Sequence, residues 1–404
     1  MKTATKDFKM TELGPIPKDW EVKRLGDVAT LNGRIGFRGY TVKDIVGCRE
    51  GAISLSPSNM IDGALSLNEC TYISWTKYEE SPEIKVRKGD VLIVKTGSTV
   101  GKSAYVNEAP WRMTVNPQIA VFKGFTVDGR LFAYYIGSPL IQEQISKTVV
   151  GSTIPTLSQE KVKSFIFPCP PLPEQRKIAA VLSDVDEMIA ALVKLIEKKR
   201  KIKTGAMQRL LTGKTRLPGF KGAWVEKRLG DCFEIMMGQS PESRFYNNAR
   251  KGLPLIQGNA DIQNRWSIIR MYTSQVTKVC EKGDVILSVR APVGAVGRAS
   301  CRSCLGRGVC AIKSTSDFLY HYLVYVENRW GQYSTGSTFD SINSDQLANV
   351  LIALPPTLAE QKAIAKVLGD MDEEIAALES ELAKTRQLKQ GMMQELLTGK
   401  VRLV

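Results

Sequence analysis

The sequence predicts a mixed α/β (α+β) protein in which two globular domains alternate with two long helices. Three observations support this prediction. Large parts of the chain occur twice, two segments keep a helical spacing of apolar residues over many turns, and other segments carry short apolar runs bounded by glycine. With 404 residues, the chain is long enough for two or more domains with their own cores. Its 43% hydrophobic and 24% charged residues are typical of a globular protein.

An internal repeat gives the order of these elements. The segment PPLPEQRKIAAVLSDVDEMIAAL begins at Pro170, and PPTLAEQKAIAKVLGDMDEEIAAL begins at Pro355. Such a duplication predicts the order globular unit, helix, globular unit, helix. Further repeated pairs are WEVKRLGDV at Trp20 with WVEKRLGDC at Trp224, KGDVLIV at Lys88 with KGDVILS at Lys282, and LLTGK at Leu210 with LLTGK at Leu396.

Each long helix is predicted from its apolar spacing. Apolar residues recur at steps of three and four from Ile178 to Leu210 and from Ile364 to Leu396. Prolines precede both segments, and Gly213 and Gly399 follow them, as is typical of helix starts and ends. Helices of this length would act as spacers or docking rails. The predicted divisions are domains at 1–170 and 215–355, and helical regions at 171–214 and 356–404.

The globular segments predict strands mixed with helices. The apolar runs after Lys88 and Lys282 are short and bounded by glycine, which indicates strands. Aromatic stretches with helical spacing follow them, LFAYYIGS at Leu131 and FLYHYLVY at Phe318. This alternation favours α/β domains over an all-β sandwich.

The charge of the chain predicts a polyanionic partner. Fifty-six Lys and Arg residues stand against 41 Asp and Glu, a net charge of +15. Nucleic acid is the first such partner to consider, and an anionic membrane surface is the second. The sequence has no apolar run of membrane-spanning length and no signal-like start, so we expect a cytoplasmic protein without a membrane partner. We expect its 8 cysteines to be reduced there.

Two features that could indicate a metal site are better explained by packing. Cys301, Cys304 and Cys310 are close in sequence, but a structural zinc needs four ligands and no second pair follows at suitable spacing. We expect free thiols in a strand and its turn. His321 is the only histidine and lies in an aromatic stretch, so we expect a packed helix residue and no metal.

A glycine-rich turn at residues 95–103, KTGSTVGKS, is similar to an ATP-binding loop. Only three residues separate its two glycines, whereas the phosphate-binding loop needs four, so the spacing counts against ATP. The second copy, VILSVRAPVGAVGRAS from Val285, loses the Lys-Ser ending. A turn supporting a DNA phosphate and a mere framework turn both remain open. The expected equivalences are Arg290 for Lys95 and Gly297-Arg298 for Gly101-Lys102.

The loops between the repeated segments differ, which predicts that the two globular domains recognise different targets. RIGFRGYTVKDIVGCREG after Gly33 has no counterpart in QSPESRFYNNARKGLP after Gly238, and both combine basic and aromatic residues. Such side chains can contact phosphates and base edges. The candidate DNA-binding residues are Arg34, Arg38, Tyr40, Lys95, Ser98, Thr99, Lys102, Ser152, Thr153, Arg244, Tyr246, Arg250, Arg290, Arg298, Ser337 and Thr338.

The order of the segments resembles the specificity subunit of a Type I restriction-modification enzyme over essentially the whole chain. The phrases that carry this resemblance are GSTVGKS, QRLLTGKTRLPGF and the two proline-led helix starts. The resemblance implies two target-recognition domains, each reading one half of a bipartite, non-palindromic site in double-stranded DNA. It also implies that the two helices pair as an antiparallel coiled coil that sets the spacing.

The resemblance also implies partners and cofactors. Two modification subunits would dock on the helices and methylate adenine with S-adenosylmethionine, and restriction subunits would use ATP and Mg²⁺. The chain itself would have no catalytic residue and no cofactor. The candidate docking residues are Glu174, Gln175, Ile178, Leu182, Ile189, Glu360, Gln361, Ile364, Leu368 and Ile375.

Two alternatives remain open. A self-contained methyltransferase or nuclease is one, but the sequence has no Asn/Asp-Pro-Pro-aromatic tetrad, and Asn116-Pro117-Gln118 is the nearest match. A coiled-coil scaffold that does not read DNA is the other, and its basic charge would then be incidental.

Overall fold

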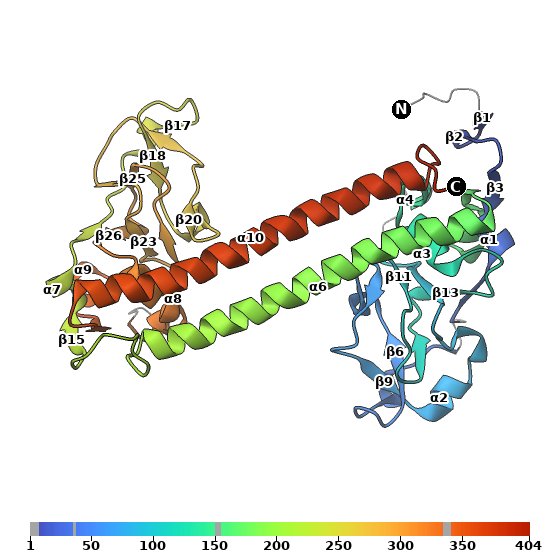
Figure 1. Ribbon diagram of the computed structural model, residues 1–404, viewed down its shortest axis with the longest axis horizontal. Coiled ribbons are helices and arrows are strands. Elements are labelled where there is room, and N and C mark those ends of the chain that lie inside the picture. Colours follow the sequence, from blue (N-terminus) through green and yellow to red (C-terminus); the bar gives the residue numbers. More distant parts are fainter. Residues whose placement is uncertain (1–7, 35–37, 150–154, 334–340) are drawn as a thin grey trace. The chain divides into compact units, whose positions relative to one another are not determined.

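The computed structural model describes residues 8–34, 38–149, 155–333 and 341–404. The chain forms two compact units, Met1–Ala191 with Leu382–Val404, and Leu192–Glu381. The two predicted long helices are present as α6 (Leu172–Leu210) and α10 (Leu358–Leu396) (Figure 1). Each unit takes one part of each long helix, so the units divide both helices near their middle.

The first unit is built on two small sheets. One sheet is antiparallel, and the other includes a parallel pair, β6 with β12. In spatial order, the first sheet contains β11 (Ser103–Tyr105), β10 (Val91–Val94), β13 (Ile119–Lys123) and β4 (Thr30–Gly33). The second contains β12 (Met113–Val115), β6 (Ala52–Leu55), β9 (Thr71–Ile73) and β5 (Ile45–Val46).

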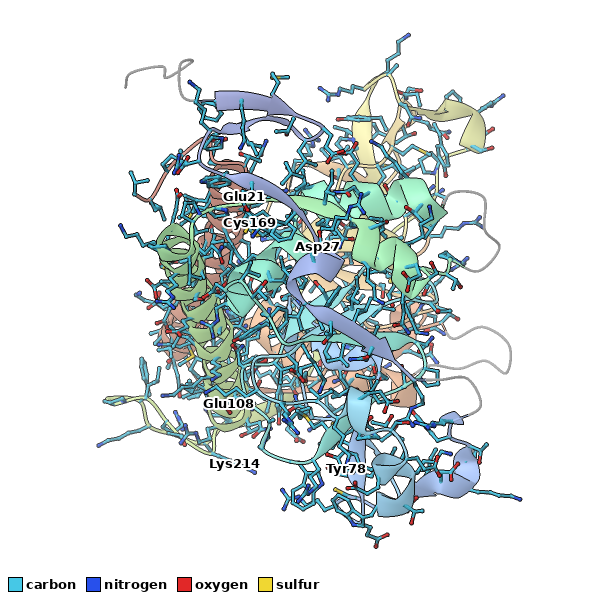
Figure 2. All side chains as sticks on the ribbon, turned by 90° about the vertical axis from the view of Figure 1, so that its right-hand side faces the viewer. Glu21, Asp27, Tyr78, Glu108, Cys169 and Lys214 are labelled. Carbon is cyan, nitrogen blue, oxygen red and sulfur yellow. The ribbon has the colours of Figure 1, made fainter. Side chains whose placement is uncertain are left out.

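Shorter strand pairs and helices complete the first unit. Glu21 of β3 lies opposite Cys169 of β14, and both are labelled in Figure 2. The strand pairs are β1 (Phe8–Thr11) with β2 (Gly14–Pro17), β3 (Glu21–Arg24) with β14 (Ile166–Cys169), and β7 (Met60–Ile61) with β8 (Ala64–Leu65). The helices are α1 (Leu25–Val28), α2 (Trp75–Glu79), α3 (Gly129–Gly137), α4 (Pro139–Val149) and α5 (Gln159–Ser164).

The second unit repeats the same strand orders. Its six-stranded sheet is β16 (Ile235–Met237), β26 (Val309–Ile312), β23 (Val285–Ser288), β24 (Val296–Arg298), β20 (Trp266–Ser267) and β19 (Ile262–Gln263). Its five-stranded sheet is β17 (Tyr246–Asn247), β21 (Tyr272–Thr273), β18 (Leu253–Ile256), β25 (Ser303–Leu305) and β22 (Val279–Cys280). The remaining elements are β15 (Val225–Arg228) paired with β27 (Leu351–Leu354), α7 (Leu229–Cys232), α8 (Phe318–Tyr325) and α9 (Ser344–Ala348).

The sheet topology therefore confirms the internal repeat in three dimensions. The order β4, β13, β10, β11 in the first unit corresponds to β16, β26, β23, β24 in the second. The parallel pair β6 and β12 likewise corresponds to β18 and β25. The predicted aromatic helices are present as α3 and α8.

The long helices are part of the domain cores. Ile178 and Leu182 of α6 are buried in the core of the first unit together with Leu396 at the end of α10. Met207 of α6 and Ile364 of α10 are buried in the core of the second unit. Removing such side chains from water is the main favourable contribution to folding. Each helix is thus held by both domains rather than acting as a free linker.

The cysteines form no disulfide bonds. All cysteines are free thiols; Cys304 lies in β25 and Cys310 in β26, as predicted. Burial raises the pKa of Cys310 to about 12.

Among the described residues, no cluster of three or more His, Cys, Asp or Glu could hold a metal ion, and no helix is long and apolar enough to span a bilayer.

His321 is a packed helix residue, as predicted, and it makes the second unit sensitive to acid. It is 1% exposed in α8, and burial lowers its pKa to about 4, although Asp372 acts in the opposite direction. An unfolded chain binds this proton below about pH 6.5, whereas the folded chain does not until about pH 4. Stability is therefore lost as pH falls through this window.

We expect His321→Leu to reduce this sensitivity. The stability of the wild type relative to the variant should fall by about 3 kcal/mol between pH 7 and pH 4, because each pKa unit corresponds to about 1.4 kcal/mol. Urea unfolding of both proteins across this range measures the difference. A difference that does not change with pH would contradict the burial of a neutral histidine.

Candidate nucleic-acid interface

A buried carboxylate ties the start of α6 to the tail that follows α10 in the first unit. Glu174 is 4% exposed and accepts a 3.0 Å hydrogen bond from the indole nitrogen of Trp20. Arg402 donates to both of its carboxylate oxygens at 2.8 and 2.9 Å, and also to Asp19. Burial alone would raise the pKa of Glu174, but the hydrogen bonds from Arg402 and Trp20 hold the pKa below its ordinary value. The ionised carboxylate therefore anchors the tail to the first domain.

The second unit repeats the Arg–Glu contact with the two helices exchanged. Arg216, which follows α6, donates to both oxygens of Glu360 in α10 at 2.6 and 2.7 Å. Glu360 has no exposed surface. Our sequence reasoning did not identify the two arginines, although each stands two residues after a repeated Thr-Gly-Lys. Each unit therefore has one Arg–Glu pair, which we call the Arg–Glu closure. It holds the start of one long helix against the segment that follows the other long helix.

The long helices pair antiparallel, as predicted. In the first unit, Asp186 of α6 forms a 2.6 Å ion pair with Lys389 in the later part of α10. In the second unit, Lys199 in the later part of α6 pairs with Glu374 in the earlier part of α10 at 2.5 Å. The first half of α6 therefore lies beside the second half of α10, and the second half of α6 lies beside the first half of α10. Exposed ion pairs of this kind contribute at most about 1 kcal/mol each, so they report on register more than on stability.

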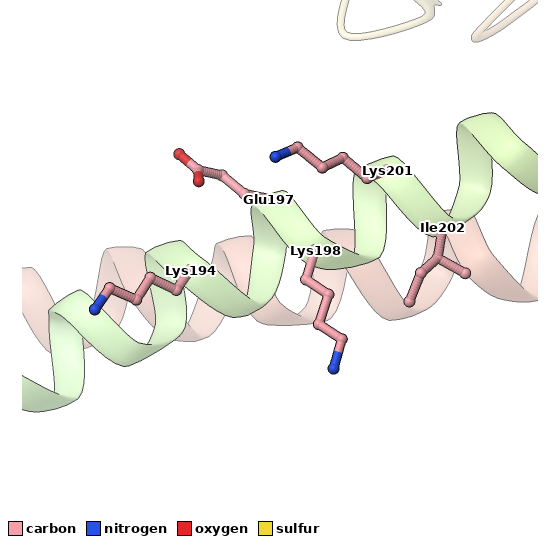
Figure 3. A pocket seen from close by; sticks show the side chains of 5 residues that line it. All are labelled: Lys194, Glu197, Lys198, Lys201 and Ile202. Carbon is pink, nitrogen blue, oxygen red and sulfur yellow. The ribbon is translucent and has the colours of Figure 1, made fainter. Parts of the chain in front are cut away.

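The basic run at residues 194–203 is divided between two faces of α6. Lys199, Arg200 and Lys203 pair with acidic residues of α10. Lys194, Lys198 and Lys201 are exposed, and their side chains project away from the helix in Figure 3.

The structure corrects the choice of docking residues on the helices. Eight of the ten candidates are buried inside the two units, and Ile189 and Gln361 are half-buried. The apolar period identifies the face of a helix that is covered, but here that face is covered by the chain's own domains. A partner that docked on α6 or α10 would therefore contact other faces of these helices. The buried candidates are Glu174, Gln175, Ile178, Leu182, Glu360, Ile364, Leu368 and Ile375.

Three candidates in the first domain's variable loop have internal partners. Arg34 is 4% exposed and donates to the carbonyl of Val115 and the hydroxyl of Thr114, both at 3.2 Å. Burial lowers its pKa. Arg38 donates to the carbonyl of Glu80 at 3.0 Å, and the hydroxyl of Tyr40 accepts a hydrogen bond from Ser54. We therefore correct the assignment of Arg34, which supports the loop from inside and is left out of the DNA surface.

In the glycine turn after β10, the two lysines lie partly within the fold, and one of them contacts another segment of the domain. Lys102 donates from its ammonium group to the carbonyl of Pro57 at 2.9 Å, and Lys95 is half-buried. Ser98 and Thr99 are exposed at the tip. These contacts favour a framework turn over a phosphate cradle.

The strand register corrects the expected equivalences between the two turns. Val91 pairs with Tyr105, and Val285 in the corresponding place pairs with Arg298. Arg298 therefore corresponds to Tyr105, not to Lys102. The equivalents are Ala295 for Lys102, Gly294 for Gly101 and Arg290 for Thr96. The second turn is one residue shorter, and sequence matching alone placed the gap wrongly.

The candidates of the second domain lie in different environments. Arg298 is half-buried, 4.0 Å from the ring centre of Tyr320 and 3.3 Å from Asp317, which indicates a structural role. The hydroxyl of Tyr246 donates to a backbone carbonyl. Arg250 and Arg290 are exposed, and Arg244 is exposed beside Glu242. The remaining candidates, Ser152, Thr153, Ser337 and Thr338, lie outside the described residues.

Comparison with known proteins matches this duplicated organisation. The family described as Type I restriction modification DNA specificity domain matches residues 17–203 and again residues 221–388. Each match therefore covers one globular domain and most of the long helix that follows it. The MjaX type I restriction enzyme specificity subunit of Methanocaldococcus jannaschii is 32% identical over 422 residues, which cover 98% of this chain and 97% of the relative.

Two solved structures are similar along the length of the chain. One, described as "Structural basis underlying complex assembly and conformational transition of the type I R-M system", has a TM-score of 0.60 at 26% identity and covers 96% of this chain and 99% of that chain. The Type I restriction-modification S subunit from M. genitalium has a TM-score of 0.61 at 16% identity, covers 94% and 96%, and shows the shared fold alone. This chain therefore belongs to the Type I restriction-modification DNA specificity family and is a specificity subunit with two target-recognition domains.

Proposed function

We propose that the two recognition domains read the two unlike halves of a bipartite, non-palindromic site in double-stranded DNA. The observation that carries this proposal is the duplicated framework with different surfaces. The two-sheet topology recurs in both domains, whereas the loops after Gly33 and Gly238 have no matching residues. Two similar scaffolds with different contacting side chains would recognise different base sequences. The net charge of +15 supports attraction to DNA phosphates.

The paired helices would hold the two readers apart and bind the other subunits. We propose two modification subunits as partners, docked on the outer faces of α6 and α10, and restriction subunits that join them. One similar solved structure is described as showing complex assembly of the type I R-M system, and this similarity supports assembly of the same kind. The pseudo-symmetric Arg–Glu closures support two equivalent docking positions. We expect the complex to reside in the cytoplasm.

Catalysis would then belong to the partners. We propose that S-adenosylmethionine is bound by the modification subunits, and ATP with Mg²⁺ by the restriction subunits. This chain would have no catalytic residue and no cofactor of its own.

Reconstitution tests this division of labour. The purified chain, incubated with DNA and S-adenosylmethionine, is expected to transfer no methyl groups, because it would supply only recognition. Adding the modification subunits should produce adenine methylation at its site. Methyl transfer by the chain alone would favour a self-contained methyltransferase. An assembled complex that binds no DNA would favour the coiled-coil scaffold.

A further inference from the structure

The first domain has a surface pocket of about 350 Å³ beside the start of β10. The ring of Tyr78, which is labelled in Figure 2, lines the pocket together with Trp111. The indole nitrogen of Trp111 donates to the carbonyl of Gly51 at 2.8 Å, so the ring is held in place. This pocket was not among the sequence candidates, because its residues come from three separate segments.

Three of the four cations in the pocket form no ion pair with another described residue. Lys85 pairs with Glu79 and lies 4.5 Å from the ring centre of Tyr78. Arg87, Lys88 and Arg112 are exposed and form no ion pair within the described part of the chain. Positive charges gathered in one pocket repel one another, and an anion bound there would relieve that repulsion.

Exposed tryptophans adjoin these cations. Trp111 is 37% exposed, and Trp75 of α2 is 41% exposed with its ring centre 6.4 Å from that of Trp111. Large apolar side chains exposed next to one another, with charged groups around them, mark interaction sites. Flat apolar rings beside unpaired cations match the deoxyribose and phosphate groups of a DNA strand.

The second domain has different residues at the positions equivalent to this pocket. Met113 and Ser303 occupy corresponding places in β12 and β25, so Arg112 corresponds to Arg302 and Trp111 to Cys301. Arg302 forms a 3.2 Å ion pair with Glu281, which stands where the first domain has Arg87. Between β21 and β22, where the first domain has α2 between β9 and β10, the second domain has no helix among its described residues. The residues that form this pocket are therefore not required by the shared framework.

The pocket and the glycine turn lie at opposite ends of β10. Arg87 and Lys88 precede the strand, and Lys95 follows it. The ammonium group of Lys102 in the turn donates to a backbone carbonyl, whereas Arg87, Lys88 and Arg112 of the pocket are exposed. Exposed cations therefore lie at the start of β10, whereas Lys95 at its end is half-buried.

We propose that this pocket binds the sugar–phosphate backbone of DNA beside the half-site that the first domain reads, with Arg87 and Arg112 each contacting a phosphate. This assignment rests on the proposed function and extends it to a surface that the sequence did not indicate. Phosphate contacts position the domain on the duplex and add affinity without base preference.

The test compares three variants in the complex assembled with the modification subunits. The probe is a duplex that carries the sequence methylated in cells, and its affinity is measured over a range of salt concentrations. For Arg87→Ala/Arg112→Ala, we expect affinity to fall by about 10- to 100-fold and the salt slope to fall by about 2, one for each lost phosphate contact. Arg87→Lys/Arg112→Lys keeps the charge and should retain most of the slope. The matched control Arg302→Ala, in the second domain, should change little.

Each other outcome has a definite meaning. Unchanged affinity and slope in the double alanine variant would overturn the pocket assignment, provided that the wild-type complex binds the duplex. An equal loss in Arg302→Ala would also overturn it, because the effect would then follow from net charge alone. Loss of the modification subunits from the double variant would make the pocket a protein-docking surface instead. Failure of the wild-type complex to bind the duplex would contradict the proposed function itself.

Discussion

Replacing residues 230–350 with the equivalent segment of a relative is expected to change one half of the methylated DNA sequence and leave the other half unchanged. The exchange leaves in place β15 and β27, which pair with each other, and both long helices. The reader of one half-site is thus replaced while the helices that set the spacing are retained. Maps of modified adenines before and after the exchange measure the result.

The reciprocal exchange is the control for this prediction. Residues 26–165 occupy the corresponding place between β3 and β14 in the first domain. Their replacement should change only the other half of the site. Changes in both halves from either exchange would contradict two independent readers.

Glu360→Ala is expected to destabilise the chain by about 2–3 kcal/mol, because it removes a fully buried carboxylate that accepts two charge-assisted hydrogen bonds from the half-buried Arg216. Glu360 has no exposed surface, and Arg216 holds both of its oxygens. Urea unfolding measures the loss. Glu174→Ala, which removes the corresponding partner of Arg402, should have a similar effect.

An exposed pair serves as the control for the buried one. Arg200 and Glu379 are 2.6 Å apart, but their side chains are 62% and 44% exposed. Glu379→Ala is therefore expected to cost less than about 1 kcal/mol. Equal losses of stability from Glu360→Ala and Glu379→Ala would show that the burial of the Arg–Glu closure does not determine how much it stabilises the chain.

Local patterns in the sequence predicted the parts of the fold that depend on local physics. The steps of three and four predicted α6 and α10, because that spacing brings apolar side chains to one face of a helix. The repeated Lys-Gly-Asp-Val segments predicted β10 and β23. The duplication itself predicted two domains with the same topology.

The site was less predictable, because burial and pairing depend on segments far apart in the chain. Arg34 has the residue type of a DNA contact, but Thr114 and Val115, eighty residues away, enclose it. Arg112 and Arg302 occupy equivalent positions, but Arg302 forms an ion pair with Glu281, where the first domain has Arg87. A basic residue near an aromatic residue is one sign of a nucleic-acid contact, and only the fold shows whether that basic residue is free of internal partners.

The central claim, that one chain carries two unlike readers of a split DNA site, is tested most directly by mapping modified bases. The map would be made in cells that carry this chain with its modification subunits and in cells that lack the chain. The account predicts methylated adenines in one gapped motif, with two different halves separated by a fixed number of unspecified bases, that disappears without the chain. An uninterrupted or palindromic motif, or an unchanged map in its absence, would contradict the account.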